Sequence, residues 1–167
     1  LTGRSIMTRF TPQAMEEIRS SRVESTERLA RLCAVLGDKA PPVWVNASAV
    51  GIYGDRGSRI LTEASSGGEG FLPDSCAAWE SACLNTDLPR VRRAALRIGI
   101  VLGKGGGAFE QLAKVTKMMA GGALGDGSQY MSWIHLDDLV RMILWIVETE
   151  GVCGPINGTA PNPVTNS

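Results

Sequence analysis

The sequence has few aromatic residues, a single histidine and no excess charge of either sign. Only 5% of its 167 residues are aromatic, and 17 basic residues balance 17 acidic ones. A formal net charge of zero gives no basic surface for nucleic acid or anionic lipid. The longest apolar runs, such as residues 142–147, are far shorter than the roughly 20 residues of a membrane-spanning helix. We therefore expect neither a nucleic acid nor a membrane as partner.

Cysteines are also few, and their spacing excludes the common zinc motifs. The four are Cys33, Cys76, Cys83 and Cys153, without a CxxC pair, and His135 is the only histidine. Cys33 falls among apolar residues of a predicted helix, where a buried free thiol is expected. This usage favours a reducing compartment over a disulfide-linked scaffold.

The hydrophobic residues, which make up 44% of the chain, follow alternating helical and strand patterns. Thr11-Pro12 is typical of a helix start, and the apolar spacing predicts a helix over residues 12–36 that ends at Gly37. Further helices are expected over residues 72–84 and 109–119, and from Asp137 or Asp138 to residue 148. Strands are expected over residues 43–47, 91–102, 130–134 and 155–157. This order predicts an α/β fold with a doubly wound parallel sheet.

Residues 43–54 read VWVNASAVGIYG, a buried strand that runs into small residues, a bend and an aromatic residue. In doubly wound sheets, ligands bind outside the carboxyl ends of the strands. Ser48 is therefore either a catalytic hydroxyl at a strand end or merely part of the way in which the strand stops. Tyr53 follows it closely.

Arg97 is an unusual residue, because it lies among apolar neighbours late in a predicted buried strand. A buried guanidinium needs an anionic partner. Residues and spacing leave two alternatives open: Arg97 contacts a ligand, or it forms an internal ion pair.

Two other motifs favour structural roles. The glycine-rich residues 103–107 lack the order of a phosphate-binding P-loop and are better interpreted as a strand-to-helix turn. His135 with Asp137 and Asp138 could be an acid/base set. The pattern is more typical of a helix entry, in which Asp caps the helix and His packs.

Six short segments together carry a resemblance to a known family. They are SRVEST (21–26), ASAVGIYG (47–54), WE (79–80), LRIGIVLG (96–103), SWIHLDDL (132–139) and NGTAPNPV (157–164). In this order they resemble the epimerase family proteins of the atypical extended short-chain dehydrogenase/reductase (SDR) group, which are NAD-dependent epimerase/dehydratase-like. The resemblance covers nearly the whole chain and is closest to bacterial and plant plastid members.

The resemblance implies a Rossmann-like fold, in which residues 1–167 form one partial NAD(P)-binding domain. The chain then looks like an internal fragment that lacks the first strands, their glycine loop for the pyrophosphate, and most of the carboxyl-terminal substrate domain. Residues from about 104 to 167 would include the start of the substrate-binding part. We expect this segment alone to bind NADP weakly or not at all.

The resemblance also implies a function. It points to an NADP-dependent oxidoreductase or epimerase-like protein, with NADP or NAD as cofactor. The substrate is left open, and nucleotide sugars and carbonyl compounds are the classes that the resemblance suggests. The alternative is a non-catalytic NADP-binding or structural protein of the same fold, for example in plastid or cell division. The implied compartment is the cytoplasm of bacteria or the plastid of plants and algae, and the oligomeric state is left open.

Five residues match positions that the family uses. Glu17, Arg22 and Arg97 match positions that are similar to NADP(H)-contacting ones, although Glu17 could instead orient Arg22. Ser48 matches the strand-end hydroxyl of the SDR active site. Tyr53 is a conceivable acid, or equally a packing residue.

The chain departs from the family in its proton relay. Classical SDR enzymes carry Tyr-x-x-x-Lys on the helix after the Ser-bearing strand, where the tyrosine moves a proton as hydride transfers. The best alignment gives Cys76-x-x-x-Glu80 here. A carboxylate cannot replace an ammonium beside a phosphate-rich cofactor, so the standard relay is absent from the sequence.

Overall fold

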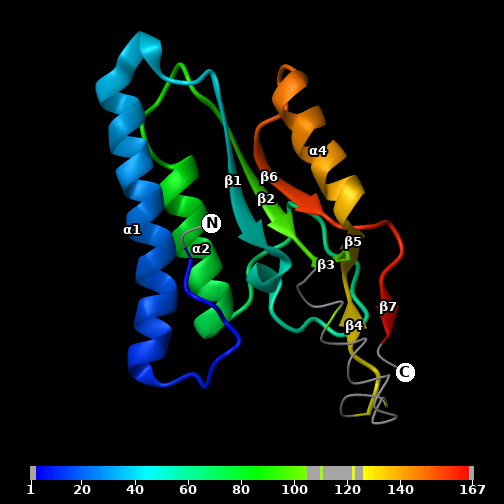
Figure 1. Ribbon diagram of the computed structural model, residues 1–167. Helices are drawn as coiled ribbons and strands as arrows, with labels where there is room; N and C mark the ends of the chain where they lie inside the picture. Colours follow the sequence, from blue (N-terminus) through cyan, green and yellow to red (C-terminus); the bar gives the residue numbers. More distant parts are fainter. Residues whose placement is uncertain (1–2, 105–109, 111–121, 123–125, 166–167) are drawn as a thin grey trace.

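Three parallel strands form the centre of the computed structural model, which describes residues 3–104, 110, 122 and 126–165. In sheet order they are β1 (Val43–Ala49), β2 (Arg92–Ile98) and β6 (Gly154–Gly158). The helices α1 (Pro12–Leu36) and α2 (Phe71–Leu84) lie on one face of the sheet, and α4 (Leu136–Glu148) lies on the other (Figure 1). The predicted α/β, Rossmann-like arrangement is confirmed.

The first helix begins and ends where the sequence predicts. The Thr11 hydroxyl accepts a hydrogen bond from the Ala14 backbone N–H at 3.2 Å, and Pro12 occupies the first turn, where no N–H is needed. Gly37 ends the helix with φ of 51°, a conformation that favours glycine. Residues 105–107 of the predicted turn at 103–107, and the predicted helix 109–119 except for residue 110, lie outside the described residues.

Successive residues of β2 point to opposite faces of the sheet. Ala94 and Leu96 face α4 and form a core cluster with its Leu139 and Ile146. Arg97, one position further along, points to the opposite face, where it meets α2. One strand therefore supplies an apolar face to α4 and a polar face to α2.

Two adjacent arginines at the start of β2 each hold the end of a helix. Arg92 donates hydrogen bonds of 2.6–2.8 Å to three backbone carbonyl groups at and beyond the end of α4, those of Ile146, Val147 and Val152. Arg93 does the same at the end of α2, with the carbonyl groups of Cys83 and Thr86. Carbonyl groups at a helix end lack intrahelical partners and carry partial negative charge, so a guanidinium stabilises them.

The single strand predicted over residues 91–102 is wrong, because it is divided at Gly99. β2 ends before Gly99, and β3 (Ile100–Leu102) pairs instead with β5 (Trp133–His135). A Cβ atom at position 99 would lie 2.6 Å from the carbonyl oxygen of Ser132, so the two backbones approach as only glycine allows. The uniformly apolar sequence hides this change of partner.

The strand predicted over residues 130–134 is divided as well. β4 (Tyr130–Met131) pairs antiparallel with β7 (Val164–Thr165), whereas the residues after Ser132 belong to β5 and the parallel pairing with β3. The carbonyl of Ser132 accepts a hydrogen bond from the Ile100 N–H at 2.8 Å. The break therefore lies where the chain passes from one pairing to another.

The predicted start of the last helix is also corrected. His135, not an aspartate, is the N-cap residue, and its Nδ1 accepts a hydrogen bond from the Asp137 N–H at 3.2 Å. The His135 side chain is 53% exposed, so it does not pack as expected. Asp137 and Asp138 occupy the first turn, where carboxylates favour the positive end of the helix dipole.

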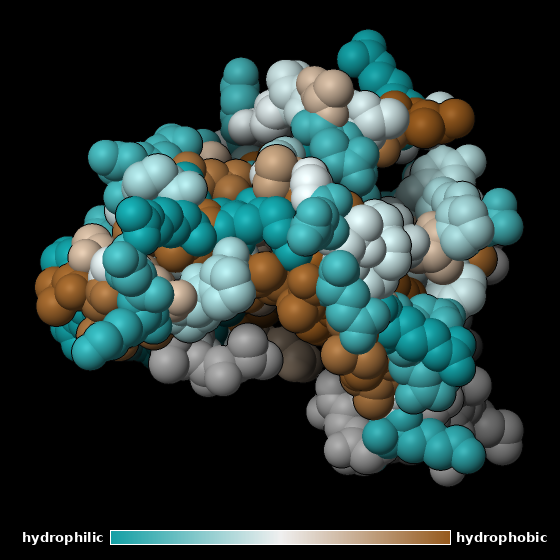
Figure 2. Space-filling view, turned by 90° about the horizontal axis from the view of Figure 1, so that it is seen from above, coloured by the Kyte–Doolittle hydropathy of each residue, from teal (hydrophilic) through white to brown (hydrophobic). Residues whose placement is uncertain are grey.

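The surface is of mixed character. Figure 2 shows hydrophilic side chains over much of one face, with hydrophobic groups between them. No helix in the described ranges is both long and apolar enough to span a membrane. All four cysteines are free thiols, and Cys33 is half-buried rather than buried, because α1 places it at the margin of a small cluster around Ala30.

The hydrogen bonds from Arg92 to the end of α4 give a first prediction. Replacing Arg92 with Met keeps an unbranched side chain but removes its donors, so we expect the free energy of unfolding to fall by about 2 kcal/mol. Urea denaturation followed by circular dichroism measures the change. Arg141→Met is the control, because that side chain on α4 is 78% exposed and its ion pair with Asp138 should contribute less than about 1 kcal/mol. Equal losses in the two variants would contradict the role given to Arg92.

Candidate functional site

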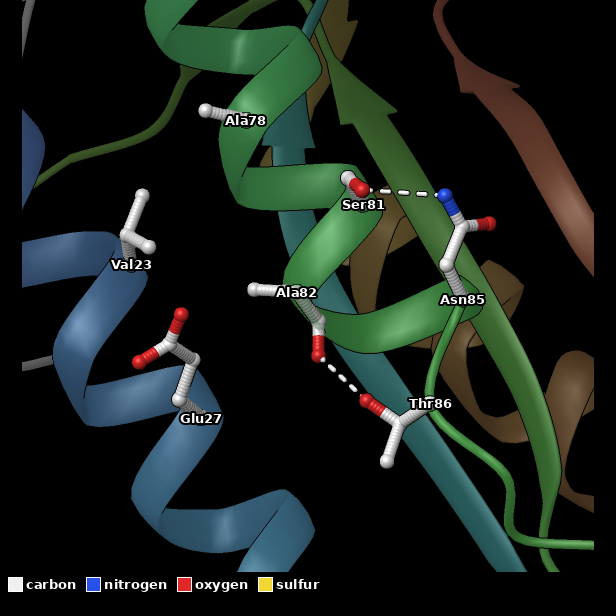
Figure 3. Close-up of a pocket in the computed structure, with 7 residues that line it drawn as sticks. All are labelled: Val23, Glu27, Ala78, Ser81, Ala82, Asn85 and Thr86. Carbon is white, nitrogen blue, oxygen red and sulfur yellow. Dashed lines mark hydrogen bonds between the residues drawn. The ribbon is translucent and has the colours of Figure 1, made fainter.

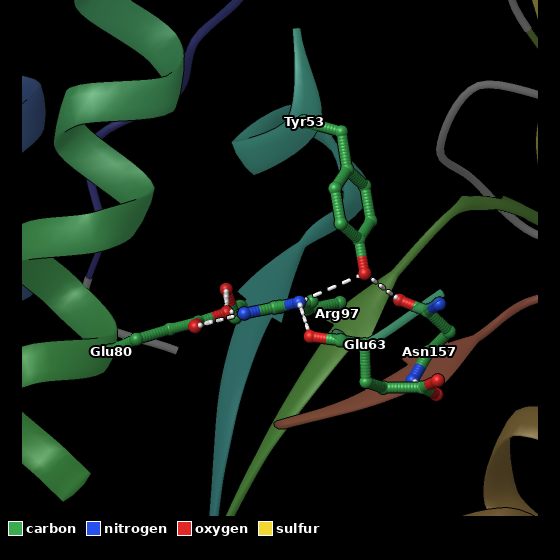
Figure 4. Close-up of polar contacts among 6 residues, drawn as sticks. Tyr53, Glu63, Glu80, Arg97 and Asn157 are labelled. Carbon is green, nitrogen blue, oxygen red and sulfur yellow. Dashed lines mark hydrogen bonds and ion pairs between the residues drawn. The ribbon is translucent and has the colours of Figure 1, made fainter. Parts of the chain in front are cut away.

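Polar side chains gather at the carboxyl ends of the three central strands (Figure 4). The strand register places Ser48 of β1 beside Arg97 of β2, and Arg97 beside Asn157 of β6. Tyr53 comes from the short 3-10 helix η2 (Val50–Tyr53) that follows β1, and Glu80 comes from α2. Five residues from five elements thus meet at one edge of the sheet.

A buried ion pair is the centre of this site. Arg97 Nε donates to Glu80 Oε1 at 2.9 Å, and Arg97 Nη2 donates to Glu80 Oε2 at 2.8 Å. The two side chains are only 9% and 8% exposed. The hydrogen bonds with Glu80 raise the pKa of Arg97 above its ordinary value, and burial opposes this rise. The guanidinium therefore stays charged. The structure shows the internal ion pair, and a ligand contact of Arg97 stays a prediction.

The hydroxyl of Ser48 joins the same ion pair. Its Oγ donates a hydrogen bond of 2.6 Å to Glu80 Oε1, and the residue is 4% exposed. A carboxylate oxygen that already accepts from a guanidinium can accept this second hydrogen. The Ser48 proton is therefore directed at Glu80, which leaves the lone pairs of Oγ as acceptors.

The phenol of Tyr53 lies on the other side of Arg97. It accepts a hydrogen bond from Arg97 Nη1 at 2.8 Å and donates one to Asn157 Oδ1 at 2.6 Å (Figure 4). The Arg97 guanidinium carbon also lies 5.1 Å from the centre of the Tyr53 ring. With 4% exposure, the phenol is held in one orientation by two partners.

The structure thus brings together three of the five residues singled out in the sequence, Ser48, Tyr53 and Arg97. Two hydroxyl groups flank one buried ion pair at the strand ends, the position where ligands bind in such sheets. The arrangement can orient both hydroxyls, and it gives the Ser48 proton a carboxylate acceptor.

Glu17 and Arg22 lie apart from this network, on α1. Glu17 forms its ion pair with Arg4, and the Arg4 carbonyl accepts from Arg22 Nη1 at 3.0 Å, so both residues hold the segment before α1. Arg22 Nη1 also donates to the Ile18 carbonyl at 2.9 Å, and the guanidinium lies 5.3 Å from the centre of the Trp79 ring.

The guanidinium of Arg22 keeps donors to spare. Within the described ranges its Nε and Nη2 have no hydrogen-bond acceptor, whereas Arg97 uses all three of its nitrogens. Burial lowers the pKa of Arg22, and the neighbouring Cys76 opposes this. Arg22 is thus a partly desolvated cation that can still donate to another anion.

Cys76 and Glu80 lie one helical turn apart on α2. Burial raises the pKa of the Cys76 thiol to about 11, with Glu80 adding to the effect and Arg22 opposing it. At neutral pH the thiol is protonated and a weak nucleophile. Glu80 serves the ion pair with Arg97, so these two positions offer neither the phenol nor the ammonium of the standard relay.

Sequence reasoning missed three parts of the network. The sequence pattern marks Glu80 only as a residue that does not fit the lysine position, and it places Asn157 in a strand without a role. Glu63 lies in the irregular stretch between η2 and α2 and carried no signal. Its carbonyl accepts from Arg97 Nη1 at 3.3 Å, and its Oε1 accepts from the Asn157 N–H at 2.7 Å. A buried arginine in a strand indicates that a carboxylate exists, but not which one.

A separate groove lies between α1 and α2 (Figure 3). Its volume is about 400 Å³, and its lining residues are Val23, Glu27, Ala78, Ser81, Ala82, Asn85 and Thr86. None of them belongs to the polar network, and small side chains dominate the α2 side. No group of three or more His, Cys, Asp or Glu in the described part of the chain could hold a metal ion. The network at the strand ends is therefore the better candidate site.

Comparison with known proteins identifies relatives over nearly the whole chain, although no protein-family model matches the sequence. The epimerase family protein SDR39U1 homolog, chloroplastic, of Arabidopsis thaliana is 42% identical over 165 residues, which are 98% of this chain and 47% of the relative. The chain spans about half the length of the curated relatives it matches.

Two solved structures match at high similarity. Human epimerase family protein SDR39U1 (isoform 2), solved with NADPH, has a TM-score of 0.89 at 32% identity over 99% of this chain and 57% of that chain. The nucleoside-diphosphate sugar epimerase from Corynebacterium glutamicum has a TM-score of 0.84 at 39% identity, over 96% and 34% of the respective chains. Both agree with the arrangement of strands and helices described above.

The buried ion pair gives the second prediction. Glu80→Gln keeps the side-chain shape but leaves Arg97 without a negative partner, so we expect the free energy of unfolding to fall by about 3–5 kcal/mol. Glu24→Gln is the matched control, because Glu24 pairs with Arg28 on the exposed surface of α1 and should contribute less than about 1 kcal/mol. Chemical denaturation of both variants tests the difference. A small loss for Glu80→Gln would show that the pair is dispensable for stability.

Proposed function

This chain belongs to the atypical extended SDR epimerase family, and from that premise we propose that the whole protein is a nicotinamide-dinucleotide-dependent oxidoreductase or epimerase-like enzyme. The observation that carries the proposal is the pair of hydroxyls, Ser48 and Tyr53, on one buried Glu80–Arg97 ion pair at the strand ends. Hydride transfer to or from an alcohol or carbonyl carbon requires a proton to move at the attached oxygen. The network supplies oriented groups for that proton.

NADP is the cofactor that we assign first, with NAD as the second choice. The structure of human SDR39U1 was solved with NADPH. Within the described residues, Arg22 has N–H donors without an acceptor, and these fit a phosphate or ribose oxygen. Glu17 supports the segment before α1 through Arg4, and Arg97 orients the hydroxyls. The cofactor supplies the hydride acceptor or donor, and Arg22 is the described residue that we expect to hold it.

The chain's own residues account for the proton. In the oxidation direction, Ser48 Oγ accepts the proton of a substrate hydroxyl while its own proton passes along the 2.6 Å hydrogen bond to Glu80. The hydride leaves the substrate carbon for the cofactor, so charge and atoms balance. Arg97 holds Glu80 in place and fixes the phenol of Tyr53 as a second hydrogen-bonding group. This relay does not need the missing Tyr-x-x-x-Lys.

The substrate that we favour is a small molecule with a carbonyl or hydroxyl group, and a nucleotide sugar is the leading class. The support is the Corynebacterium glutamicum relative, which is described as a nucleoside-diphosphate sugar epimerase. The compartment that we favour is the bacterial cytoplasm or the plastid, since a chloroplastic plant protein and bacterial proteins are among the relatives.

A second candidate function is dinucleotide binding without turnover. It is favoured by the burial of Ser48 and Tyr53, each 4% exposed, and by their hydroxyl protons, which are donated to internal acceptors. In that case Ser48 and Tyr53 stabilise the strand ends and the fold serves as a binding module.

The cofactor assignment is tested by NADPH fluorescence with the full-length protein. Arg22→Gln removes the charge and the free donors, so we expect the Kd to rise about 10-fold or more. Arg28→Gln, on the exposed side of the same helix, should leave the Kd unchanged. Tight NADPH binding by the Arg22 variant would exclude the contact.

The chemistry is tested by turnover with a panel of nucleotide sugars and carbonyl compounds, with NADPH oxidation and sugar epimerisation as readouts. Ser48→Ala removes the relay and should lower kcat about 100-fold, while NADPH affinity stays at the wild-type value. Tyr53→Phe should lower kcat less, because the ring and its packing remain. A wild-type protein that binds NADPH and turns over no member of the panel would support the binding module instead.

A further inference from the structure

The position of the Tyr53 phenol depends on two residues, and one loop residue touches both of them. Arg97 Nη1 donates to the phenol and Asn157 Oδ1 accepts from it. Glu63 accepts from the same Arg97 nitrogen with its carbonyl oxygen, and from the Asn157 backbone N–H with its carboxylate. Figure 4 shows Glu63 beside Arg97 and Asn157, the two partners of the phenol. Glu63 is therefore linked to the phenol through these two residues.

The contact with Asn157 is the stronger of the two. Its 2.7 Å length and the charged acceptor are typical of a strong hydrogen bond, whereas the contact with Arg97 is 3.3 Å long. It also fixes the backbone of the very residue whose side chain accepts the Tyr53 proton. A displacement of the Asn157 backbone would carry its amide oxygen away from the phenol.

The loop that carries Glu63 is itself bound to the backbone of Tyr53. The Arg56 guanidinium donates to the Tyr53 carbonyl at 3.0 Å and also to the Gly67 carbonyl, so it closes the loop across its two ends. A Cβ atom at Gly68 would lie 2.6 Å from the Tyr53 carbonyl oxygen, which shows how closely the returning chain passes.

Glu63 also lies within a closed turn. The Thr62 N–H donates to Ser65 Oγ, and the Ser65 N–H donates to the Thr62 carbonyl, both at 2.9 Å. These bonds fix the backbone on both sides of Glu63. Its carboxylate is on an exposed residue, so it is the accessible end of a chain of contacts that runs through half-buried Asn157 to the buried Tyr53 and Arg97.

We propose that Glu63 is a positioning residue, which couples the loop of residues 54–70 to the Tyr53 phenol through Asn157 and Arg97. Its consequence for turnover rests on the proposed function, but the coupling itself does not. When the Glu63 carboxylate holds the Asn157 N–H, the phenol keeps both of its hydrogen bonds. When the carboxylate is removed, Asn157 is released and the phenol loses its fixed acceptor.

The coupling is tested by NMR of the full-length protein with tyrosine labelled by ¹³C at the ring carbon that bears the hydroxyl. The shift of this carbon reports hydrogen bonding at the phenol oxygen, and Tyr53→Phe identifies the Tyr53 signal by its loss. We expect Glu63→Ala to move or broaden the Tyr53 signal and Glu63→Gln to restore it, because Gln keeps an acceptor oxygen. Glu69→Ala, another exposed glutamate of the loop, should leave the signal in place.

A Tyr53 signal that stays in its wild-type position in Glu63→Ala, but moves in Asn157→Ala, would overturn the proposal. If the full-length protein turns over a substrate, Glu63→Ala should also lower kcat about 10-fold, with KM little changed, and Glu63→Gln should recover it. Absence of turnover in every variant would count against the proposed function alone, since the NMR signal reports the coupling independently. An unchanged signal together with normal turnover of the wild-type protein would count against Glu63 alone.

Discussion

The buried ion pair between Glu80 and Arg97 is the interaction on which the candidate site depends. Two charges with less than a tenth of their side-chain surface exposed are tolerable only when each is paired and its remaining hydrogen-bonding capacity is used. The pair recruits a serine hydroxyl on the carboxylate side, and a phenol and a loop carbonyl on the guanidinium side. The geometry of the site thus follows from the need to supply hydrogen-bond partners to one buried ion pair.

Parallel register explains why these groups meet. Ser48, Arg97 and Asn157 occupy equivalent positions on three neighbouring strands, so their side chains form a row across the same face of the sheet. The alternation that turns this row toward α2 also turns Leu96 toward α4 and the core. A shift of one residue in the pairing of β2 would bury the guanidinium in that apolar cluster, which is why the register is strongly specified.

Much of the fold, and part of the site, could be predicted from the sequence. Apolar periodicity predicts α1 and the strand over residues 43–47, which the structure extends to include Ser48, and the expected burial of Arg97 indicates an anionic partner. That the partner is Glu80, 17 residues earlier, depends on how α2 lies against the sheet, which no local pattern encodes. The exchange of strand partners at Gly99 was hidden because both strands are apolar. Glu63 was missed since irregular loops carry no periodicity from which a contact can be inferred.

The two arginines at the start of β2 have a consequence for how this chain can vary. Arg92 and Arg93 are consecutive, yet one fastens the end of α4 and the other the end of α2, on opposite faces of the sheet. A single peptide unit therefore links the ends of two helices that lie in different layers. Insertions and deletions in the connections that leave these helices are compatible with the fold only beyond the clamped carbonyl groups. We therefore expect length changes to be tolerated best in the outer parts of those loops, where they leave the clamped carbonyl groups in place.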